Sequence, residues 1–368
     1  MQDNNSQMRL KGKKRRKNEN AILFGSIILC IITLCSVTLC MIMVFKYSAA
    51  QLENVEVMNE LETLQGNYTE EEVAALINSN TEEVFKQASD ETRQEILDSM
   101  KDMMLSGDGA LKMIRHFYPD EIVMVDASQY YFFPILDKLE QHTYVKDNFV
   151  VNEDELLEYY EGDNLISHKG IDVSKYQEKI DWKKVAQDDV EYAFIRLGIR
   201  GYTEGEIKKD DTFNNNIEGA LNNNIDVGVY FFSQATSVEE AKEEAEFVLN
   251  EIEPYNVTYP VVLDVEAVNV DNARTEDVTK EERTEYCIAF CDMVKKAGYT
   301  PMIYGNLKTF MMLLDIEQLE DYDKWFAQYD TELYYPYDFK VWQYTDKGKV
   351  SGISTEVDMN ISFESLAQ

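Results

Sequence analysis

The chain has 368 residues, which is enough for two domains or for one barrel with an added segment. Its formal net charge is −34, and because such an acidic chain repels phosphate backbones, nucleic acid is excluded as a partner. The chain has only three histidines and no His-x-x-x-His or Cys-x-x-Cys spacing, so neither a zinc site nor any other metal or cofactor is expected.

Residues 1–20 are a short basic tail, and residues 21–45 contain no charged side chain. At about 1.5 Å per residue, the uncharged stretch can cross a hydrocarbon core of about 30 Å, so it predicts a transmembrane helix in contact with the lipid bilayer. Seven Lys and Arg residues against two acids in residues 1–45 predict a cytoplasmic N-terminus and an extracellular remainder. We therefore expect a single-pass protein of the cell membrane. A cleaved signal peptide is the alternative, but its apolar region is only about 7–15 residues long.

Residues 46–165 have the pattern of an acidic, mostly helical α+β accessory segment, interpreted as an extracellular stalk. Capping-box spacings predict helix starts near Thr69 and Ser79, and Gly107 predicts a helix end. Two short strands are expected next, and the second is a run of four aromatic residues. Its expected role is to build a small core, with sugar binding as the alternative. Envelope proteins are candidate partners of this segment. The two strands are expected at residues 121–125 and 130–133.

Residues 166–368 alternate short apolar strands with amphipathic helices, a pattern typical of a parallel sheet with crossover helices. Eight strands in about 200 residues favour an α/β fold of a modified, TIM-like barrel type. The expected strands cover residues 170–173, 192–197, 227–232, 261–265, 302–304, 325–328, 341–344 and 357–360, and the expected helices cover residues 212–224, 238–252 and 280–297.

Four acids end or flank three of these strands. Asp264 and Glu266 are two positions apart, so in a strand they share one face and point into one cleft. Like charges held close favour protonation of one of them, and such a pair is what glycosidic bond cleavage uses. The alternative is that the pair only caps a turn. Asp172 and Asp358 belong to the first and last strands, and barrel active sites gather at the strand ends. All four acids are therefore expected to face one mouth.

Aromatic residues also stand at the ends of several expected strands. Their rings can stack on sugar rings, so an acidic centre rimmed by them fits a polysaccharide groove. Core packing is the alternative role for each one taken singly. The candidate substrate-binding residues are Tyr230, Phe232, Tyr304, Trp325, Tyr329, Trp342 and Tyr344.

A series of short motifs extends the pattern along the chain. They include Lys-Gly-Ile-Asp-Val-Ser-Lys-Tyr-Gln, Pro-Val-Val-Leu-Asp-Val-Glu and Val-Trp-Gln-Tyr, and they close with Val-Asp-Met-Asn. In order and spacing they resemble the glycoside hydrolase family 25 lysozymes, also called Chalaropsis-type or phage-type N-acetylmuramidases. The motifs occupy residues 169–177, 194–198, 228–232, 260–266, 301–304, 341–344 and 357–360.

The resemblance implies a barrel that cleaves the β-1,4 bond between N-acetylmuramic acid and N-acetylglucosamine in peptidoglycan glycan strands. It implies that Glu266 is the general acid and that Asp264 raises its pKa and orients the substrate. Asp172 and Asp358 would stabilise an oxocarbenium-like transition state or a cyclic intermediate. The expected function is thus a membrane-anchored lysozyme. The alternatives are a catalytically weak peptidoglycan-binding or scaffold protein, and an interaction protein of an envelope assembly.

Overall fold

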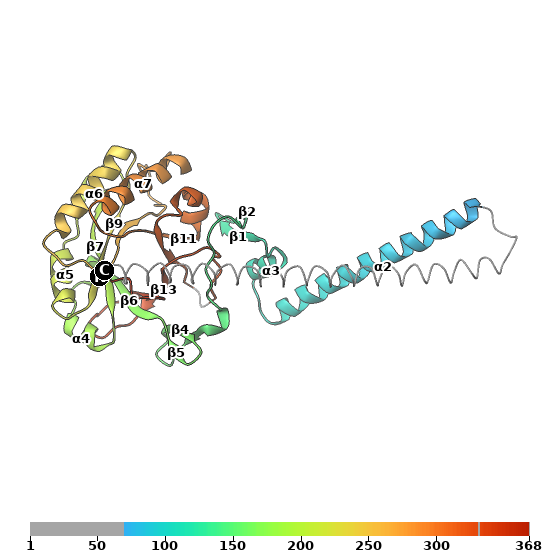
Figure 1. Ribbon diagram of the computed structural model, residues 1–368, viewed down its shortest axis with the longest axis horizontal. Helices are drawn as coiled ribbons and strands as arrows, with labels where there is room; N and C mark the ends of the chain where they lie inside the picture. The colour runs from blue at the N-terminus through green and yellow to red at the C-terminus, as the bar shows by residue number, and fades with distance from the viewer. Residues whose placement is uncertain (1–69, 330–331, 368) are drawn as a thin grey trace, which may run out of the picture. The chain divides into compact units, whose positions relative to one another are not determined.

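The computed structural model describes residues 70–329 and 332–367 (Figure 1). The chain divides into two compact units between Ser99 and Met100. The predicted basic tail at residues 1–20 and the predicted transmembrane helix at residues 21–45 lie outside the described residues. Within the described residues, no helix combines the length and the apolar character that crossing a bilayer requires.

The first described element is one long helix, α2 (Glu70–Leu105). A helix start near Ser79 was expected, but this expectation is wrong because α2 passes through that residue without a break. The helix ends before Gly107, as its sequence predicts. Gly107 has φ +86°, a left-handed conformation that glycine adopts without the steric cost of a Cβ atom.

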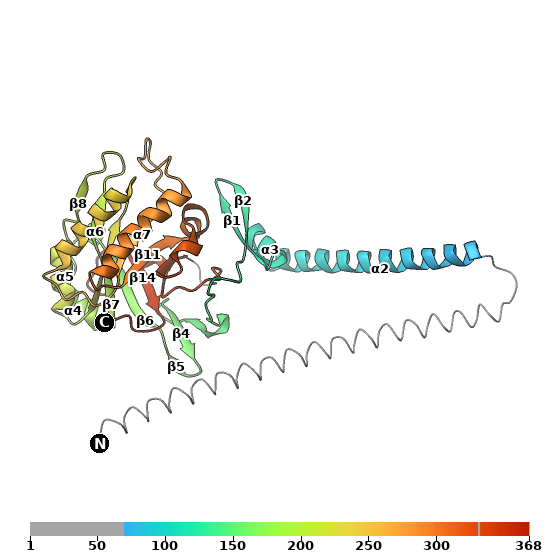
Figure 2. The ribbon, with the colours of Figure 1, turned by 45° about the horizontal axis from the view of Figure 1, so that its top comes forward.

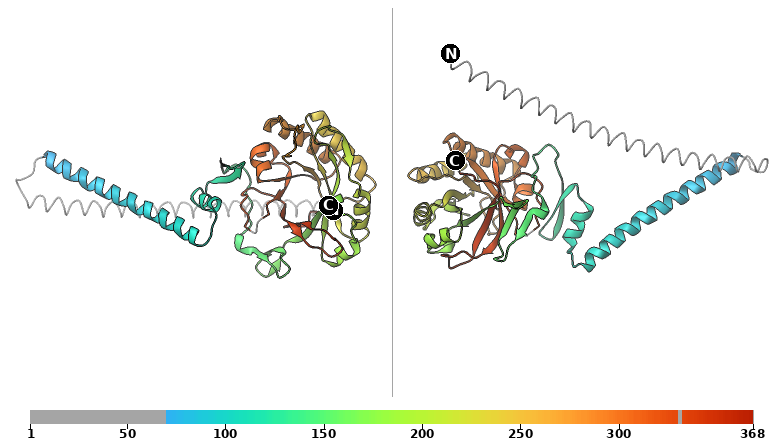
Figure 3. Two further views of the ribbon diagram at one scale, coloured as in Figure 1. Left: turned by 180° about the vertical axis from the view of Figure 1, so that it is seen from behind. Right: turned by 60° about the horizontal axis from the view of Figure 1, so that its bottom comes forward.

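In the described part of the second unit, eight strands close into a barrel, which confirms the predicted α/β barrel. Figures 1 and 3 show this closed sheet with helices around it. The strand order around the ring is β6, β14, β13, β12, β11, β10, β9 and β7, and β7 pairs back with β6. All neighbouring strands are parallel except β14, which runs antiparallel to both β13 and β6. The strands are β6 (His168–Val173), β7 (Tyr192–Arg200), β9 (Asp226–Phe232), β10 (Val261–Asp264), β11 (Pro301–Asn306), β12 (Asp323–Ala327), β13 (Val341–Gly348) and β14 (Val357–Ser362).

All eight barrel strands lie where the sequence predicts them, within a few residues at each end. A short additional strand, β8 (Ile207–Lys209), pairs antiparallel with the end of β7 and was not predicted (Figure 2). Helix α6 starts after Ser237, whose side chain accepts a hydrogen bond from the N–H of Glu240. The outer helices are α4 (Trp182–Gln187), which was not predicted, and α5 (Phe213–Leu221), α6 (Val238–Ile252) and α7 (Lys280–Lys296), which were.

Alternation along the strands divides the buried side chains of the barrel into two cores. The larger core lies between the sheet and the helices and includes Val229, Val248 and Phe290. The smaller core fills the barrel interior with the rings of Tyr192, Phe194 and Trp325 and their neighbours. The interior is therefore a packed floor, and polar side chains can gather only at the mouth above it.

Residues 100–165 belong to the same compact unit as the barrel. The two strands predicted at residues 121–125 and 130–133 are confirmed as a hairpin, and the second strand alternates in exposure, so Tyr130 and Phe132 are exposed while Tyr131 and Phe133 pack inward. The three-stranded sheet that follows was not predicted. The elements are α3 (Ala110–Phe117), β1 (Glu121–Asp126), β2 (Gln129–Pro134), β3 (Phe149–Val151), β4 (Leu157–Glu161) and β5 (Asn164–Leu165).

Candidate active site

The structure brings the four predicted acids together at one end of the barrel. Asp172 lies in β6, and Asp358 lies directly opposite it in β14. Asp264 ends β10, and Glu266 follows two residues later. The charge of Glu266 raises the pKa of each of the other three acids, so the four carboxyl groups form one electrostatic cluster.

Asp172 is the acid of this cluster that has two amide donors. Its Oδ2 accepts hydrogen bonds from Nε2 of Gln343 at 2.8 Å and from Nδ2 of Asn360 at 2.9 Å. Burial raises the pKa of Asp172 to about 6, while the two amides lower it and the charge of Glu266 raises it. Because the amides bond to the charged form, Asp172 ionises near neutral pH even though it is buried.

The two amides are themselves fixed by donors to their oxygen atoms. Oε1 of Gln343 accepts hydrogen bonds from the hydroxyls of Tyr304 at 2.8 Å and Tyr329 at 3.0 Å. Oδ1 of Asn360 accepts a hydrogen bond from the indole N–H of Trp325 at 2.8 Å. With their oxygens occupied in this way, both amides present N–H groups to the carboxylate, and the network therefore favours its charged state.

Sequence reasoning missed Gln343 and Asn360, although a signal was present. Asn360 is two residues after Asp358 and so shares its face of β14, which is the same argument that joined Asp264 and Glu266. Gln343 lies between two aromatic residues of β13, and those two were selected as candidate binding residues in its place.

Asp264 and Glu266 form a hydrogen-bonded pair of carboxyl groups. Asp264 is 4% exposed, and its pKa is raised well above the usual value, first by burial and then by the charges of Glu266 and Asp172. Burial also raises the pKa of Glu266, whereas the hydrogen bond with Asp264 lowers it, so the expectation that Asp264 raises the pKa of Glu266 is wrong. A pair that resists double ionisation retains one shared proton, so it can serve as an acid at a pH where Asp172 is charged.

Asp358 differs from Asp172 in its surroundings, although both acids were expected to have the same role. Burial, followed by the charges of Asp172 and Asp346, raises the pKa of Asp358 to about 8. Asp358 is therefore neutral at pH 7, where its partner across the strand pair is mostly ionised.

The structure places four of the predicted substrate-binding aromatics around the acids. Tyr230 and Tyr304 are half-buried, and charges of the acid cluster raise the pKa of each hydroxyl further after burial has done so. Tyr329 is 54% exposed, so its ring is available at the mouth. Phe232 is half-buried and packs edge-on against Tyr202.

Three other predicted binding residues are corrected by the structure. Trp325 is on the inner face but is 1% exposed and stacks on Phe194 at 4.5 Å between ring centroids, so it is part of the floor. Trp342 and Tyr344 belong to the core outside the sheet. They alternate in β13 with Gln343, which points inward to Asp172, and so the two rings must point outward.

The rim near Asp172 carries one further residue that the sequence did not single out. Arg196 at the mouth end of β7 forms an ion pair with Asp210 at 2.7 Å and lies 5.0 Å from the ring centroid of Tyr176. Its positive charge lowers the pKa of Asp172. Arg196 therefore supports the ionised form of that acid.

The shared proton predicts a pH effect for Asp264→Asn. The variant removes the acid of the pair whose pKa is raised well above its usual value, so the proton that remains on Glu266 dissociates at lower pH than the last proton of the pair. We expect the alkaline limb of the pH–rate profile to move to lower pH, while the acidic limb, which belongs to Asp172, stays near its place. The profile should be measured on soluble glycan fragments. An unchanged alkaline limb would show that the two carboxyl groups titrate independently.

Comparisons with known proteins give the following similarities. Residues 171–353 match the family model of glycosyl hydrolases family 25. The uncharacterized protein YegX of Escherichia coli is 31% identical over 203 residues, which cover 52% of this chain and 68% of YegX. The autolytic lysozyme of Clostridium acetobutylicum is 25% identical over 193 residues, which cover 52% of this chain and 55% of the lysozyme. The structure of the modular autolysin LytC from Streptococcus pneumoniae in complex with synthetic peptidoglycan ligand matches with a TM-score of 0.49 and 22% identity, over 66% of this chain and 57% of that chain.

Proposed function

The chain belongs to glycosyl hydrolases family 25 and is a glycoside hydrolase of the lysozyme type, and from this premise we propose that it cleaves the β-1,4 bond between N-acetylmuramic acid and N-acetylglucosamine in peptidoglycan. The observation that carries this proposal is the difference in protonation state among the acids. Asp264 and Glu266 retain a proton, while Asp172 is held in its charged form by two amides. One acid and one carboxylate at the same mouth are the minimum for glycosidic cleavage.

In the proposed mechanism, Glu266 donates the proton that it shares with Asp264 to the oxygen that leaves the bond. Positive charge develops on the sugar ring as the bond breaks, and the carboxylate of Asp172 stabilises it. Asp358, neutral at pH 7, can donate a hydrogen bond to a sugar hydroxyl beside Asp172. Tyr329 offers an exposed ring at the same mouth for stacking on the sugar.

Mass spectrometry of the fragments that the full-length protein releases from purified peptidoglycan tests the bond specificity. Reducing-end muramic acid is the expected product, and reducing-end glucosamine would overturn the proposal. Tight binding to peptidoglycan with no released fragments would instead identify a binding or scaffold protein. The buried acid cluster argues against that alternative, because buried carboxyl groups cost folding free energy unless they serve a function.

We further propose that the enzyme acts while tethered to the cell membrane, with residues 1–20 in the cytoplasm and the barrel outside. The charge bias before residues 21–45 supports this topology. Outside the membrane, the barrel would meet the peptidoglycan next to the cell that makes it.

The topology predicts the result of protease treatment on intact, wall-stripped cells. An added protease should digest the region after residue 46 and leave residues 1–45 protected, because the bilayer shields the membrane segment and the cytoplasmic tail. Immunoblots against tags at the two ends would report the two outcomes. A barrel that resists digestion until the membrane is permeabilised would indicate the inverted topology.

A further inference from the structure

The β1–β2 hairpin lies outside residues 171–353, which match the family, yet its tip lies beside the loops that follow β10 and β11. Asp126 at the tip forms an ion pair of 2.7 Å with Lys308, which follows β11. The same tip borders the loop that begins directly after Glu266. The accessory segment therefore adds a wall beside the predicted general acid.

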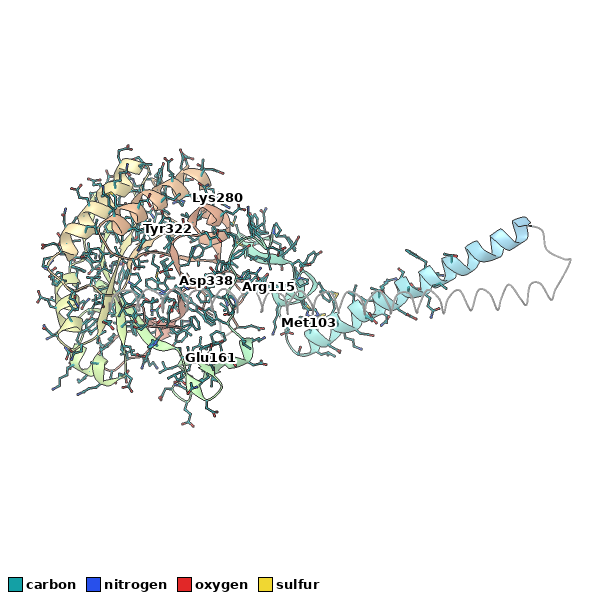
Figure 4. The ribbon with its side chains drawn as sticks, in the orientation of Figure 1. Met103, Arg115, Glu161, Lys280, Tyr322 and Asp338 are labelled. Carbon is teal, nitrogen blue, oxygen red and sulfur yellow. The ribbon has the colours of Figure 1, made fainter. Side chains whose placement is uncertain are left out.

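The hairpin is firmly attached at its base. The hydroxyl of Tyr334 accepts a hydrogen bond from the N–H of Val123 at 2.5 Å and donates one to the carbonyl of Glu121 at 3.2 Å. Arg115, labelled in Figure 4, donates to the carbonyl of Val123 at 3.0 Å and lies 3.4 Å from the ring centroid of Tyr334. With these contacts at one end and the Asp126–Lys308 pair at the other, the hairpin is a preorganised wall.

A cleft of about 480 Å³ separates this wall from the barrel loops. That volume is within the range of small-ligand sites, roughly 300–1,000 Å³. Two lining residues come from the hairpin tip, three directly follow Glu266, and three lie at and after the end of β11. Asn269 is one of the residues after Glu266, and Asn306 is the residue at the end of β11.

The chemistry of the cleft fits an N-acetylated sugar. Oδ1 of Asn306 accepts a hydrogen bond from the N–H of Thr309 at 3.1 Å, which leaves the Nδ2 group of this exposed side chain directed away from the backbone as a donor. Asn269 is also exposed and can both donate and accept. Small apolar side chains, such as Ala267 and Val268, offer contacts for an acetamido methyl group. The only charged groups lining the cleft, Asp126 and Lys308, neutralise each other.

The strand order defines which part of the substrate would reach this cleft. Around the described eight-strand ring, β10 is four strands from β14 and β11 is four strands from β6, so the cleft is across the mouth from Asp358 and Asp172. The sugar that gains positive charge must lie against Asp172, and Glu266 protonates the bond on its far side. The cleft is therefore on the side of the departing part of the glycan.

We propose that this cleft is a saccharide subsite for the leaving side of the glycan strand, built by the accessory hairpin together with the loops after β10 and β11. This assignment rests on the proposed function. Asn269 and Asn306 recognise hydroxyl and acetamido groups of the departing sugars, and the Asp126–Lys308 pair holds the wall in place. The subsite gives the enzyme a preference for strands that continue beyond the cleaved bond.

The test compares two substrates of the full-length protein. Peptide-free glycan strands extend into the cleft, whereas the 4-nitrophenyl glycoside of the N-acetylglucosaminyl–N-acetylmuramic acid disaccharide has no sugar on the leaving side. In Asn269→Ala and in Asn306→Asp, which keeps the Oδ1 acceptor for Thr309, the ratio of kcat/KM on strands to kcat/KM on the aryl glycoside should fall roughly 5-fold to 10-fold. Asn269→Ala adds no charge beside the general acid, so a fall of the ratio in this variant separates the loss of the amide from an electrostatic effect.

Asn164→Ala is the matched control, because Asn164 is an exposed residue of β5 that does not line the cleft. Its ratio should equal that of the unmodified protein, and thermal unfolding should confirm that all variants fold. An unchanged ratio in both cleft variants would overturn the proposal. A fall seen only with peptide-bearing strands would assign the cleft to the stem peptide and overturn the saccharide assignment. If the unmodified protein cleaves neither substrate, the proposed function itself fails.

Discussion

Glu266→Gln should lower kcat on purified peptidoglycan by at least about 100-fold, the lower end of typical general-acid contributions. The substitution keeps the size of the side chain and its ability to hydrogen-bond with Asp264, but it removes the carboxyl proton that the leaving oxygen requires. We expect little change in KM, because the proton is transferred only as the bond breaks. Release of soluble muropeptides at saturating substrate measures the effect.

The control for this variant is Glu246→Gln, which makes the same substitution on the exposed surface of α6. It should retain full activity, and both variants should unfold at the same temperature as the unmodified protein within a few degrees. Near-normal turnover by Glu266→Gln would remove Glu266 from the mechanism, and Asp264 would then become the candidate acid because it shares the same proton.

Asp172→Asn should lower kcat by roughly 100-fold to 1,000-fold, the range observed when a group aimed at developing charge is removed. The asparagine fits the space and can accept from Gln343 and Asn360, but it cannot offset positive charge on the sugar ring. In the unmodified enzyme, activity should decline as the pH falls through about 6, since Asp172 then takes up a proton. This acidic limb should disappear in the variant, whose residual activity should depend on the Asp264–Glu266 pair.

Asp358→Asn provides the contrast that identifies the charged acid. Because the pKa of Asp358 is raised to about 8, the residue is already neutral at pH 7, and the amide replaces a neutral hydrogen-bonding group. We therefore expect a much smaller loss at pH 7 than for Asp172→Asn. Equal losses in the two variants would show that both acids are ionised in the working enzyme, which would contradict a neutral Asp358.

The sequence pattern was sufficient to predict the barrel, because its buried strands are short apolar runs and helices alternate with the first several of them. The acids could be predicted for a related reason, since their positions at strand ends follow from where strands stop. Trp342 and Tyr344 show the limit of this reasoning. In the first half of β13 both faces are buried, so hydropathy alone does not reveal which side chains point inward.

The accessory hairpin shows a second limit. Its strands were predicted from local sequence, but the Asp126–Lys308 ion pair joins residues far apart in the chain. The local sequence does not predict such a contact, since each partner alone resembles an ordinary surface charge. The contacts of Tyr334 with β1 are non-local in the same way. The location of the hairpin beside Glu266, and with it the cleft, therefore required the folded structure.

The antiparallel strand β14 also constrains when the enzyme can become active. This strand joins β13 to β6 and supplies both Asp358 and Asn360, although its partner β6 begins the barrel almost two hundred residues earlier. Chains fold as they leave the ribosome, from the N-terminus onward. The ring must therefore remain open, and the amide from Asn360 absent from Asp172, until translation has passed β14. A chain terminated before β14 therefore lacks both Asp358 and the amide of Asn360, and its acid cluster is incomplete.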